Sequence, residues 1–385
     1  MTDPSGFPLD DLIALRRDLH AHPELGFEER RTAALVAERL RALGLEVAEG
    51  VGETGVVATL GRGGRAVGLR ADMDALAMDE TSGRPWASSK PGRMHACGHD
   101  GHTVMLLGAA ARLAANPPPE GVVRFIFQPA EEGRGGARRM EADGFRQRFP
   151  CDLVFGLHNM PGLAPDEMAV VAGPQLASSD SWRVTLAGVG THGAKPHLGR
   201  DAVTAAGQFL TALQAIPGRV VDPLQPAVVS ACSVQAGDPE ALNVIPAEVH
   251  IGGTARAYAP GVRDQLEEEI GRLAAGIAAA AGVEARYKFI RRIPPVVNDP
   301  QATRIALAAA QDAAAGGVRT AFPPSTAGDD FAVFQEGAPG AYVWLGNGPA
   351  EDGALHHNPG YDFNDAAIPT GVAFWEAVAR QALAA

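Results

Sequence analysis

The chain has 385 residues, a net charge of −12 and 46% hydrophobic residues. This length exceeds what one hydrophobic core usually organises and predicts two domains, and the ordinary balance of charged, apolar, glycine and proline residues excludes a fibrous or disordered protein. Because nucleic acids and anionic membranes bind clustered lysine and arginine, the negative charge argues against either as a partner.

The first twenty residues lack a basic segment followed by a long apolar run, and no stretch is long and apolar enough to cross a bilayer. We therefore expect a cytoplasmic protein. Cys97, Cys151 and Cys232 are odd in number and widely spaced, which disfavours a disulfide framework. In a reducing compartment, a thiol beside histidines is a candidate metal ligand.

Apolar residues recur at helical spacing from residue 9 to 43, interrupted by HPELGFEE, where Pro23 and Gly26 break the pattern before a second helix from about Arg30 to Leu43. Strands and helices then alternate. RAVGLRADMDAL, GVVRFIFQPAEEG and CDLVFGLHN are typical of buried strands, and HTVMLLGAAARLAA is typical of a helix. This order predicts an α/β fold with a mostly parallel sheet sandwiched by helices.

From residue 179 the pattern changes to strand, helix, two strands, helix and strand. This βαββαβ order is that of the ferredoxin-like motif. After Pro294, helices and a strand resume the first pattern. We therefore predict a discontinuous catalytic domain over residues 1–178 and 290–385, with a ferredoxin-like α+β domain inserted at 179–289.

Polar residues follow each predicted strand of the large domain, where parallel sheets bind their ligands. They are Asp72 and Asp74, Glu131 and Glu132, and His158 and Asn159. Cys97 and His99 stand two apart, so in an extended loop they could face one side and suit zinc or another transition ion. The adjacent carboxylates of FQPAEEG diverge, so one could touch a cation while the other reaches a bound water.

Each feature also has a structural explanation that is commoner for a residue standing alone. Cys97 could be a buried small hydrophobe, the paired glutamates a solvated loop, and His158 a hydrogen-bonded core histidine. His356 and His357 could belong to a surface turn announced by the following Asn-Pro-Gly. All four explanations would have to hold together for the chain to lack a metal site.

The chain resembles the M20 metallopeptidase and aminoacylase family, in the amidohydrolase branch that holds hippurate hydrolases, IAA-amino acid hydrolases and N-acyl-amino acid amidohydrolases. The resemblance runs from end to end and is carried by RRDLHAHPELGFEE, LRADMDAL, MHACGHDGHT, FQPAEEGRGGARRM, GLHN, GTHGAKPH, NVIPAEV, GTAR and HNPGYDFND, in that order. It implies a di-metal aminopeptidase-like catalytic domain and an inserted domain that forms a homodimer.

Carried over position by position, the resemblance implies two divalent ions, for which zinc, manganese, cobalt and nickel are all suitable. Their ligands would be Cys97, His99, Glu132, His158 and His357. Glu131 would be the general acid and base, and Asp74 would orient a ligating imidazole. Asp72 stands where many relatives carry a ligating histidine, and we leave it out of the ligand set. His95 and His356 receive no role.

In the inserted domain, the resemblance implies that His192 completes the active site of the partner subunit. Asn243 and Arg256 would hold the free carboxylate of the substrate, which suits the two parallel donors of a guanidinium. The implied mechanism has two ions polarising an amide carbonyl and activating water, Glu131 moving the proton, and His192 stabilising the oxyanion.

We therefore predict a metal-dependent amidohydrolase that cleaves N-acyl amino acids, hippurate-like, into a carboxylic acid and a free amino acid. Alternatives on the same site are dipeptidase or carboxypeptidase activity and release of an aromatic amine. A catalytically silent metal- or ligand-binding protein is a further alternative, which the presence of Glu131 beside five candidate ligands disfavours. A structural interaction module would need none of these residues.

Overall fold

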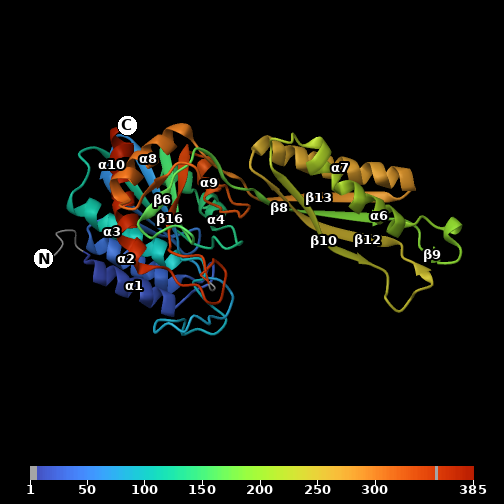
Figure 1. The fold of residues 1–385 in the computed structure, drawn as a ribbon, viewed down its shortest axis with the longest axis horizontal. Helices are drawn as coiled ribbons and strands as arrows, with labels where there is room; N and C mark the ends of the chain where they lie inside the picture. The colour runs from blue at the N-terminus through green and yellow to red at the C-terminus, as the bar shows by residue number, and fades with distance from the viewer. Residues whose placement is uncertain (1–6, 352–353) are drawn as a thin grey trace. The chain divides into compact units, whose positions relative to one another are not determined.

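The computed structural model describes residues 7–351 and 354–385, which form two compact units (Figure 1). The first unit takes the chain up to Gly173, then Val297–Pro323 and Asp330–Ala385. The second is Pro174–Val296 together with Pro324–Asp329. The span predicted for the inserted domain, 179–289, lies inside the second unit, which continues for several residues on each side.

The first unit contains a mixed sheet that, in the described residues, has eight strands in the order β1-β2-β4-β3-β5-β16-β6-β15. The strands are β1 (Glu46–Val51), β2 (Gly55–Arg62), β3 (Ala66–Asp72), β4 (Gly121–Gln128), β5 (Leu153–Met160), β6 (Glu167–Ala169), β15 (Gly317–Arg319) and β16 (Gly340–Gly346). The four central strands β4, β3, β5 and β16 are parallel to one another. The predicted α/β class with a mostly parallel central sheet is thus confirmed.

Helices cover both faces of this sheet (Figure 1). They are α1 (Leu9–Ala21), α2 (Arg30–Ala42), α3 (His99–Ala115), α4 (Gly136–Ala142), α5 (Phe145–Arg148), α8 (Pro300–Ala313), α9 (Ala332–Gln335) and α10 (Ile368–Ala384), with a 3₁₀ turn at Asp365–Ala367. The main core lies between the sheet and α1, α2, α3, α8 and α10. Because the central strands are buried on both faces, their sequences are apolar runs that do not alternate.

The carboxyl ends of the central strands meet at one edge of the sheet, since these strands are parallel. The chain runs from β3 to β4 on one side of β3 and later places β5 on the other side. The strand order therefore reverses at β3, which is where open α/β sheets bind their ligands. Asp72 and His158 lie at this edge.

Helix α3 begins at His99, three residues before the start that the sequence predicted. Gly98 precedes it with a φ of 89°, a left-handed conformation that favours glycine. A Cβ at this position would lie 2.4 Å from Nδ2 of Asn159 and 2.5 Å from the hydroxyl of Tyr361. Cys97 and His99 are therefore joined by a tight turn, in place of the extended loop that we expected.

A buried network of charges attaches α1 to the first turn of α3. The fully buried His20 directs Nδ1 to Asp100 at 2.9 Å and Nε2 to Glu80 at 3.3 Å. Arg16, also fully buried, contacts Asp100 at 3.5 Å and Asp362 at 2.8 Å. Burial opposes a charge on His20, but the carboxylates of Asp100 and Glu80 raise its pKa to about 9.

The second unit is built in the predicted order β8, α6, β10, β12, α7, β13, and its antiparallel sheet has the strand order β10-β12-β8-β13. Its elements are β8 (Ser179–Ala187), β9 (Thr191–His192), α6 (Ala202–Leu213), β10 (Ala227–Ala236), β11 (Val244–Ile245), β12 (Glu248–Ala257), α7 (Pro260–Ala281) and β13 (Glu284–Ile293), with helical turns at Pro196–Leu198 and Ile216–Val220. The chain passes between the units through β7 (Gly173–Leu176) and β14 (Val296–Asn298).

A separate core holds the second unit together. Helices α6 and α7 pack on one face of the sheet, against Trp182, Val184 and Leu186 of β8. At the start of β8, the buried carboxylate of Asp180 accepts hydrogen bonds from Nε and Nη2 of Arg263, at 2.8 and 2.6 Å. None of the helices in the described ranges of the chain combines the length and apolar character that a membrane crossing needs.

Replacing His20 should change how stability depends on pH. Because the folded-state pKa of about 9 exceeds the unfolded value of about 6.5, the stabilisation is complete below pH 6.5 and is lost as the pH rises through 9. We expect His20→Gln to lower the free energy of unfolding of the metal-free protein by on the order of 2 kcal/mol at pH 6, and by much less at pH 10. Urea unfolding at both pH values measures this, with His22→Gln, a change at a partly exposed histidine of the same segment, as control. An equal loss at both values would contradict it.

Removing the partner of Asp180 should destabilise the second unit. Among the described residues, Arg263→Leu leaves the buried carboxylate with the backbone N–H of Arg292 as its remaining donor, at 3.0 Å, and should cost about 3 kcal/mol. The matched control is Arg286→Leu, which breaks the exposed pair with Glu248 and should leave the urea midpoint unchanged. Similar midpoints for the two variants would show that the buried pair has no special weight.

Candidate metal centre

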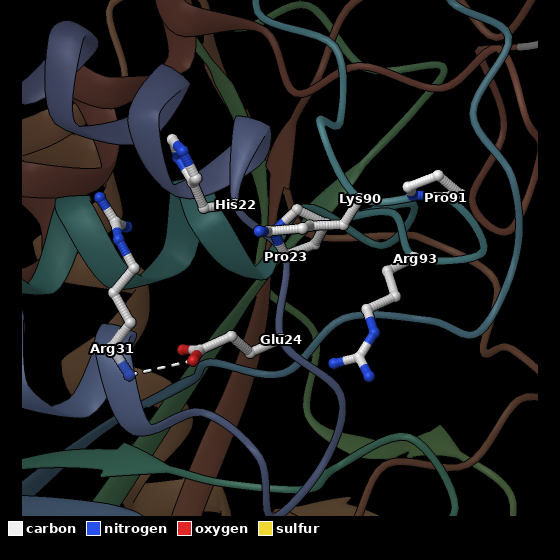
Figure 2. A pocket seen from close by; sticks show the side chains of 7 residues that line it. All are labelled: His22, Pro23, Glu24, Arg31, Lys90, Pro91 and Arg93. Atoms are coloured by element: carbon white, nitrogen blue, oxygen red, sulfur yellow. Dashed lines mark hydrogen bonds between the residues drawn. The ribbon is translucent and has the colours of Figure 1, made fainter.

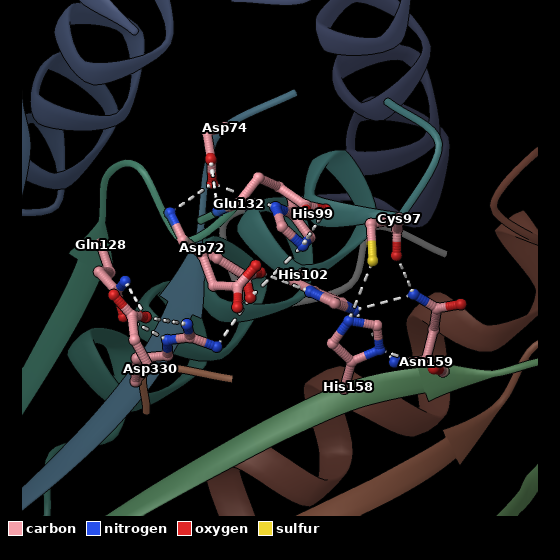
Figure 3. A network of polar contacts seen from close by, with 12 residues as sticks. Asp72, Asp74, Cys97, His99, His102, Gln128, Glu132, His158, Asn159 and Asp330 are labelled. Carbon is pink, nitrogen blue, oxygen red and sulfur yellow. Dashed lines mark hydrogen bonds and ion pairs between the residues drawn. The ribbon is translucent and has the colours of Figure 1, made fainter. Parts of the chain in front are cut away.

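Cys97, His99 and His158 come together at the carboxyl edge of the sheet, from the loop before α3, the first residue of α3 and the end of β5 (Figure 3). Each offers a donor atom within 4.8 Å of the others. Sγ of Cys97 lies 3.4 Å from Nε2 of His158. Nδ1 of His158 donates to the backbone oxygen of Asn159 at 2.8 Å, which leaves Nε2 as the nitrogen that can accept a metal.

Two further groups of donors overlap with the first. Cys97, Glu132 and His357 form one, and His99, Glu131 and Glu132 form the other, each with donor atoms within 4.8 Å. Oε1 of Glu132 lies 3.2 Å from Nε2 of His357 and 4.0 Å from Nε2 of His99. The five predicted ligands and Glu131 therefore surround one region, and the overlap of the groups suits two neighbouring cations.

His357 is held in an unusual backbone conformation. Its φ is 60°, in the left-handed region that residues other than glycine seldom adopt. The backbone N–H of His357 donates to the oxygen of Ala96 at 2.8 Å, which ties the segment to the loop that carries Cys97. Strain of this kind persists only where surrounding contacts enforce it, and it is common at ligand sites.

The state of the donor atoms fits a cation. Both nitrogens of His99 and Oε1 of Glu132 are buried, and within the described residues they make no well-formed hydrogen bond; their ion-pair contacts, with carboxylates and with His357, are at 3.2 Å or more. Burial and the nearby carboxylates of Glu132 and Glu131 raise the pKa of Cys97 well above its usual value. Because a buried polar group without a hydrogen bond is unfavourable, a cation bound here would satisfy these atoms and favour the thiolate.

Asp74 connects the imidazole of His99 with the backbone of the glutamate pair. Its Oδ1 lies 3.3 Å from Nδ1 of His99. Its two oxygens also accept the backbone N–H groups of Glu131 and Glu132, both at 3.0 Å. Its contacts therefore reach beyond the single imidazole that the resemblance assigned to it.

The carboxylate of Asp72 contacts the guanidinium of Arg70 and the imidazoles of two histidines. Its Oδ2 accepts from Nη1 of Arg70 at 2.7 Å and lies 3.6 Å from Nε2 of His99, while its Oδ1 accepts from Nδ1 of His102 at 2.6 Å. Burial opposes the charge, but Arg70, His99 and His102 hold the pKa of Asp72 well below its usual value. Asp72 is thus an ionised carboxylate whose oxygens are already engaged.

Asn159 and His102 support the metal site from outside the predicted ligand set; the sequence places Asn159 after a strand without a role, and it favours His102 as a residue that braces the loop and begins the helix. Nδ2 of Asn159 donates to the backbone oxygen of Cys97 at 2.6 Å, and Nε2 of His102 accepts the backbone N–H of Asn159 at 3.0 Å. Oδ1 of Asn159 accepts from His356 and from the hydroxyl of Tyr361, both at 2.8 Å. The position of His102 three residues after His99, on the same face of α3, could have indicated its involvement.

The two histidines without a predicted role are neutral. Burial lowers the pKa of His356 to about 3 and that of His95 to about 4. His356 is hydrogen-bonded to Asn159, and Asn159 in turn binds the backbone of Cys97, so His356 stabilises the Cys97 loop indirectly. His95 is buried, and its ring centroid lies 6.3 Å from that of His20. Neither of its nitrogens has a hydrogen-bond partner in the described part of the chain.

The three site residues predicted in the second unit do not lie together. His192 pairs with Val244 across β9 and β11, and the N–H of Gly193 donates to the oxygen of Asn243 at 2.7 Å, so His192 and Asn243 are neighbours. Arg256 lies near the far end of β12, which begins only after Asn243. Eight residues of strand separate Glu248 from Arg256, a distance of about 26 Å.

The first unit also has a surface pocket of about 460 Å³ (Figure 2). It is lined by His22, Pro23, Glu24, Arg31, Lys90, Pro91 and Arg93. Its arginines are already paired, Arg31 with Asp18 at 2.6 Å and Arg93 with Glu28 at 2.7 Å. Because none of its residues belongs to the donor groups, this pocket is not a candidate catalytic site.

Comparison with known proteins agrees with this geometry. The model of peptidase family M20/M25/M40 matches residues 68–381. The hippurate hydrolase of Campylobacter jejuni is 39% identical over 373 residues, which are 96% of each chain. The N-acetyl-L-cysteine deacetylase of Bacillus subtilis is 39% identical over 93% of this chain and 84% of the relative.

A solved structure is similar over nearly the whole chain. It is a dinuclear metal-binding peptidase of family M20 from Bacillus subtilis, with 36% identity, a TM-score of 0.83 and 98% of each chain covered. Together with the donor groups at the sheet edge, this likeness supports a site for two divalent metals. The resemblance seen in the motifs is thereby confirmed, and the chain belongs to peptidase family M20/M25/M40, whose members hydrolyse amide bonds.

Proposed function

We propose that this protein is a dinuclear metal amidohydrolase that cleaves N-acyl amino acids into a carboxylic acid and a free amino acid. The observation that carries the proposal is the convergence of the five donor residues beside Glu131 at the carboxyl edge of the sheet. The two curated relatives support the substrate class, because they are named for hippurate and for N-acetylcysteine, which are both N-acyl amino acids.

Cys97, His99, Glu132, His158 and His357 would hold the ions, which when bound polarise an amide carbonyl and lower the pKa of water. A thiolate and imidazoles favour zinc or cobalt, while the carboxylate also accepts manganese or nickel. Glu131 would accept the proton of the attacking water and deliver a proton to the departing nitrogen. Its backbone is fixed by Asp74, so its carboxylate approaches the site from a defined direction.

The second unit would bind the substrate and complete the site in a homodimer. Arg256 can donate two parallel hydrogen bonds to the free carboxylate of the amino acid, and Asn243, which neighbours His192, would assist from a second copy of the chain. Arg256 lies near the end of β12 that is remote from Asn243 and His192, and the strand from Glu248 to Arg256 alone spans about 26 Å. We therefore infer that His192 stabilises the oxyanion in the site of a second copy of the chain.

A substrate screen tests the proposed reaction. We expect metal-loaded protein to release equal amounts of carboxylic acid and amino acid from N-benzoyl or N-acetyl amino acids, faster than it cleaves dipeptides or N-acylated aromatic amines. Glu131→Gln should lower kcat by about 10³-fold with the metal content unchanged. Faster cleavage of dipeptides or of N-acylated aromatic amines would show that the proposed substrate class is wrong. If the protein hydrolyses none of the compounds, the proposed function is contradicted.

Mixing two inactive variants tests the shared site. A dimer of one Glu131→Gln chain and one His192→Ala chain has a single site with both residues intact, if His192 acts across the dimer. Random exchange makes half of the dimers mixed, so mixing should restore about a quarter of wild-type activity. Recovery after joint unfolding and refolding is the measurement. If His192 acts within its own chain, no site has both residues and the mixture stays inactive.

A further inference from the structure

A second buried carboxylate, Glu29, holds the turn that carries the glutamate pair. Glu29 comes from the HPELGFEE segment and is fully buried just before α2. Its Oε1 accepts the backbone N–H of Ala130 at 2.8 Å, and its Oε2 accepts the hydroxyl of Thr54 at 2.6 Å. Nothing in the metal-site geometry itself requires a carboxylate at this place.

The turn after β4 is strained and closely packed. Ala130 has a φ of 53°, a left-handed conformation that is unfavourable for alanine. A Cβ at Gly136 would lie 1.6 Å from the oxygen of Pro129, and a Cβ at Gly26 would lie 2.9 Å from Cα of Ala130. Such a turn keeps its shape only where neighbouring groups enforce it.

Three consecutive backbone donors of this turn are bound by carboxylates. The N–H of Ala130 donates to Glu29, and the N–H groups of Glu131 and Glu132 donate to the two oxygens of Asp74. Charge-assisted hydrogen bonds of this kind are short and strong. Asp74 also faces His99, so it belongs to the metal site, whereas the side-chain hydrogen bonds of Glu29 within the described residues go to the turn and to Thr54.

We propose that Glu29 is a positioning residue for Glu131, which fixes the left-handed turn at Ala130 and thereby the direction of the Glu131 side chain. This inference rests on the proposed function, in which Glu131 moves the proton. Glu29 does not reach the donor groups of the metal site. A displacement of about 1 Å in a reacting group is sufficient to slow catalysis by about 100-fold, so loss of this anchor should affect kcat.

The turn needs an acceptor at position 29 and does not need its charge. Burial, with the nearby charge of Asp74, raises the pKa of Glu29 to about 7, so a neutral side chain is tolerated. In Glu29→Gln, the amide oxygen can still accept the N–H of Ala130, while the amide nitrogen can donate to the hydroxyl of Thr54. Leucine has a similar size but no acceptor.

Kinetics and hydrogen exchange together test the proposal. In metal-loaded protein, Glu29→Leu should lower kcat by about 30-fold with KM changed less than about twofold, and Glu29→Gln should keep kcat within about threefold of wild type. In metal-free protein, the peptide 127–136 of Glu29→Leu should exchange its amide hydrogens about tenfold faster. Glu28→Leu, which alters the exposed neighbour paired with Arg93, is the matched control and should change neither quantity.

Full activity in Glu29→Leu, a loss confined to KM, or equal damage by glutamine and leucine would overturn the proposal. If Glu29→Leu does not fold, Thr54→Val removes the bond that orients Glu29 and should lower kcat by about fivefold while speeding exchange of the same peptide. An unchanged Thr54→Val variant together with an unchanged Glu29→Gln variant would then refute it. If the wild type hydrolyses none of the substrates, the proposed function fails. Independently of activity, the role of Glu29 in fixing the turn is refuted if the amide hydrogens of peptide 127–136 exchange no faster in the variants than in the wild type.

Discussion

A thiol, three imidazoles and two carboxylates, most of them buried, are unfavourable when placed together at the edge of a sheet unless a cation joins them. The first unit is organised around that constraint. Its parallel strands deliver Glu131, Glu132 and His158 to one edge, and the turn at Gly98 places Cys97 and His99 beside them. His99 and Glu132 have buried atoms with ion-pair contacts but no well-formed hydrogen bond in the described residues, which are positions where a bound cation would complete the bonding.

Rigidity around the donors comes from carboxylates and amides that do not belong to the ligand set. Asp72 and Asp74 orient His102 and His99, and Asn159 binds the loop of Cys97. The Arg16, His20 and Asp100 network attaches the start of α3 to α1. A metal site needs such supporting contacts, since a ligand that can rotate away loses affinity.

The fold was predictable because its main features are periodic. Buried strands appear as apolar runs, and the change to βαββαβ near residue 179 indicated the second unit. The donor set was indicated by the position of polar residues after strands and by family resemblance. By contrast, the start of α3 was misplaced because its first turn, with His99 and Asp100, contains functional polar residues in place of an apolar periodicity.

The supporting contacts were less accessible from sequence. Glu29 and Ala130 are 101 positions apart in the sequence. Asn159 is 62 positions from Cys97 and 202 positions from Tyr361, and it is hydrogen-bonded to both. Such pairs depend on strand register and on the path of loops, which local patterns do not define. Asn243 and Arg256 illustrate the same limit, because Arg256 lies at the far end of β12 whereas Asn243 neighbours His192.

Anomalous diffraction from crystals grown with zinc tests the central claim most directly. The account predicts two peaks about 3.5–4 Å apart at the carboxyl edge of β3 and β5, with Sγ of Cys97 about 2.3 Å from one of them. The remaining contacts should come from His99, Glu132, His158 and His357. Peaks located elsewhere, or a Cys97 thiol turned away from every peak, would contradict the claim that these five side chains form one metal centre.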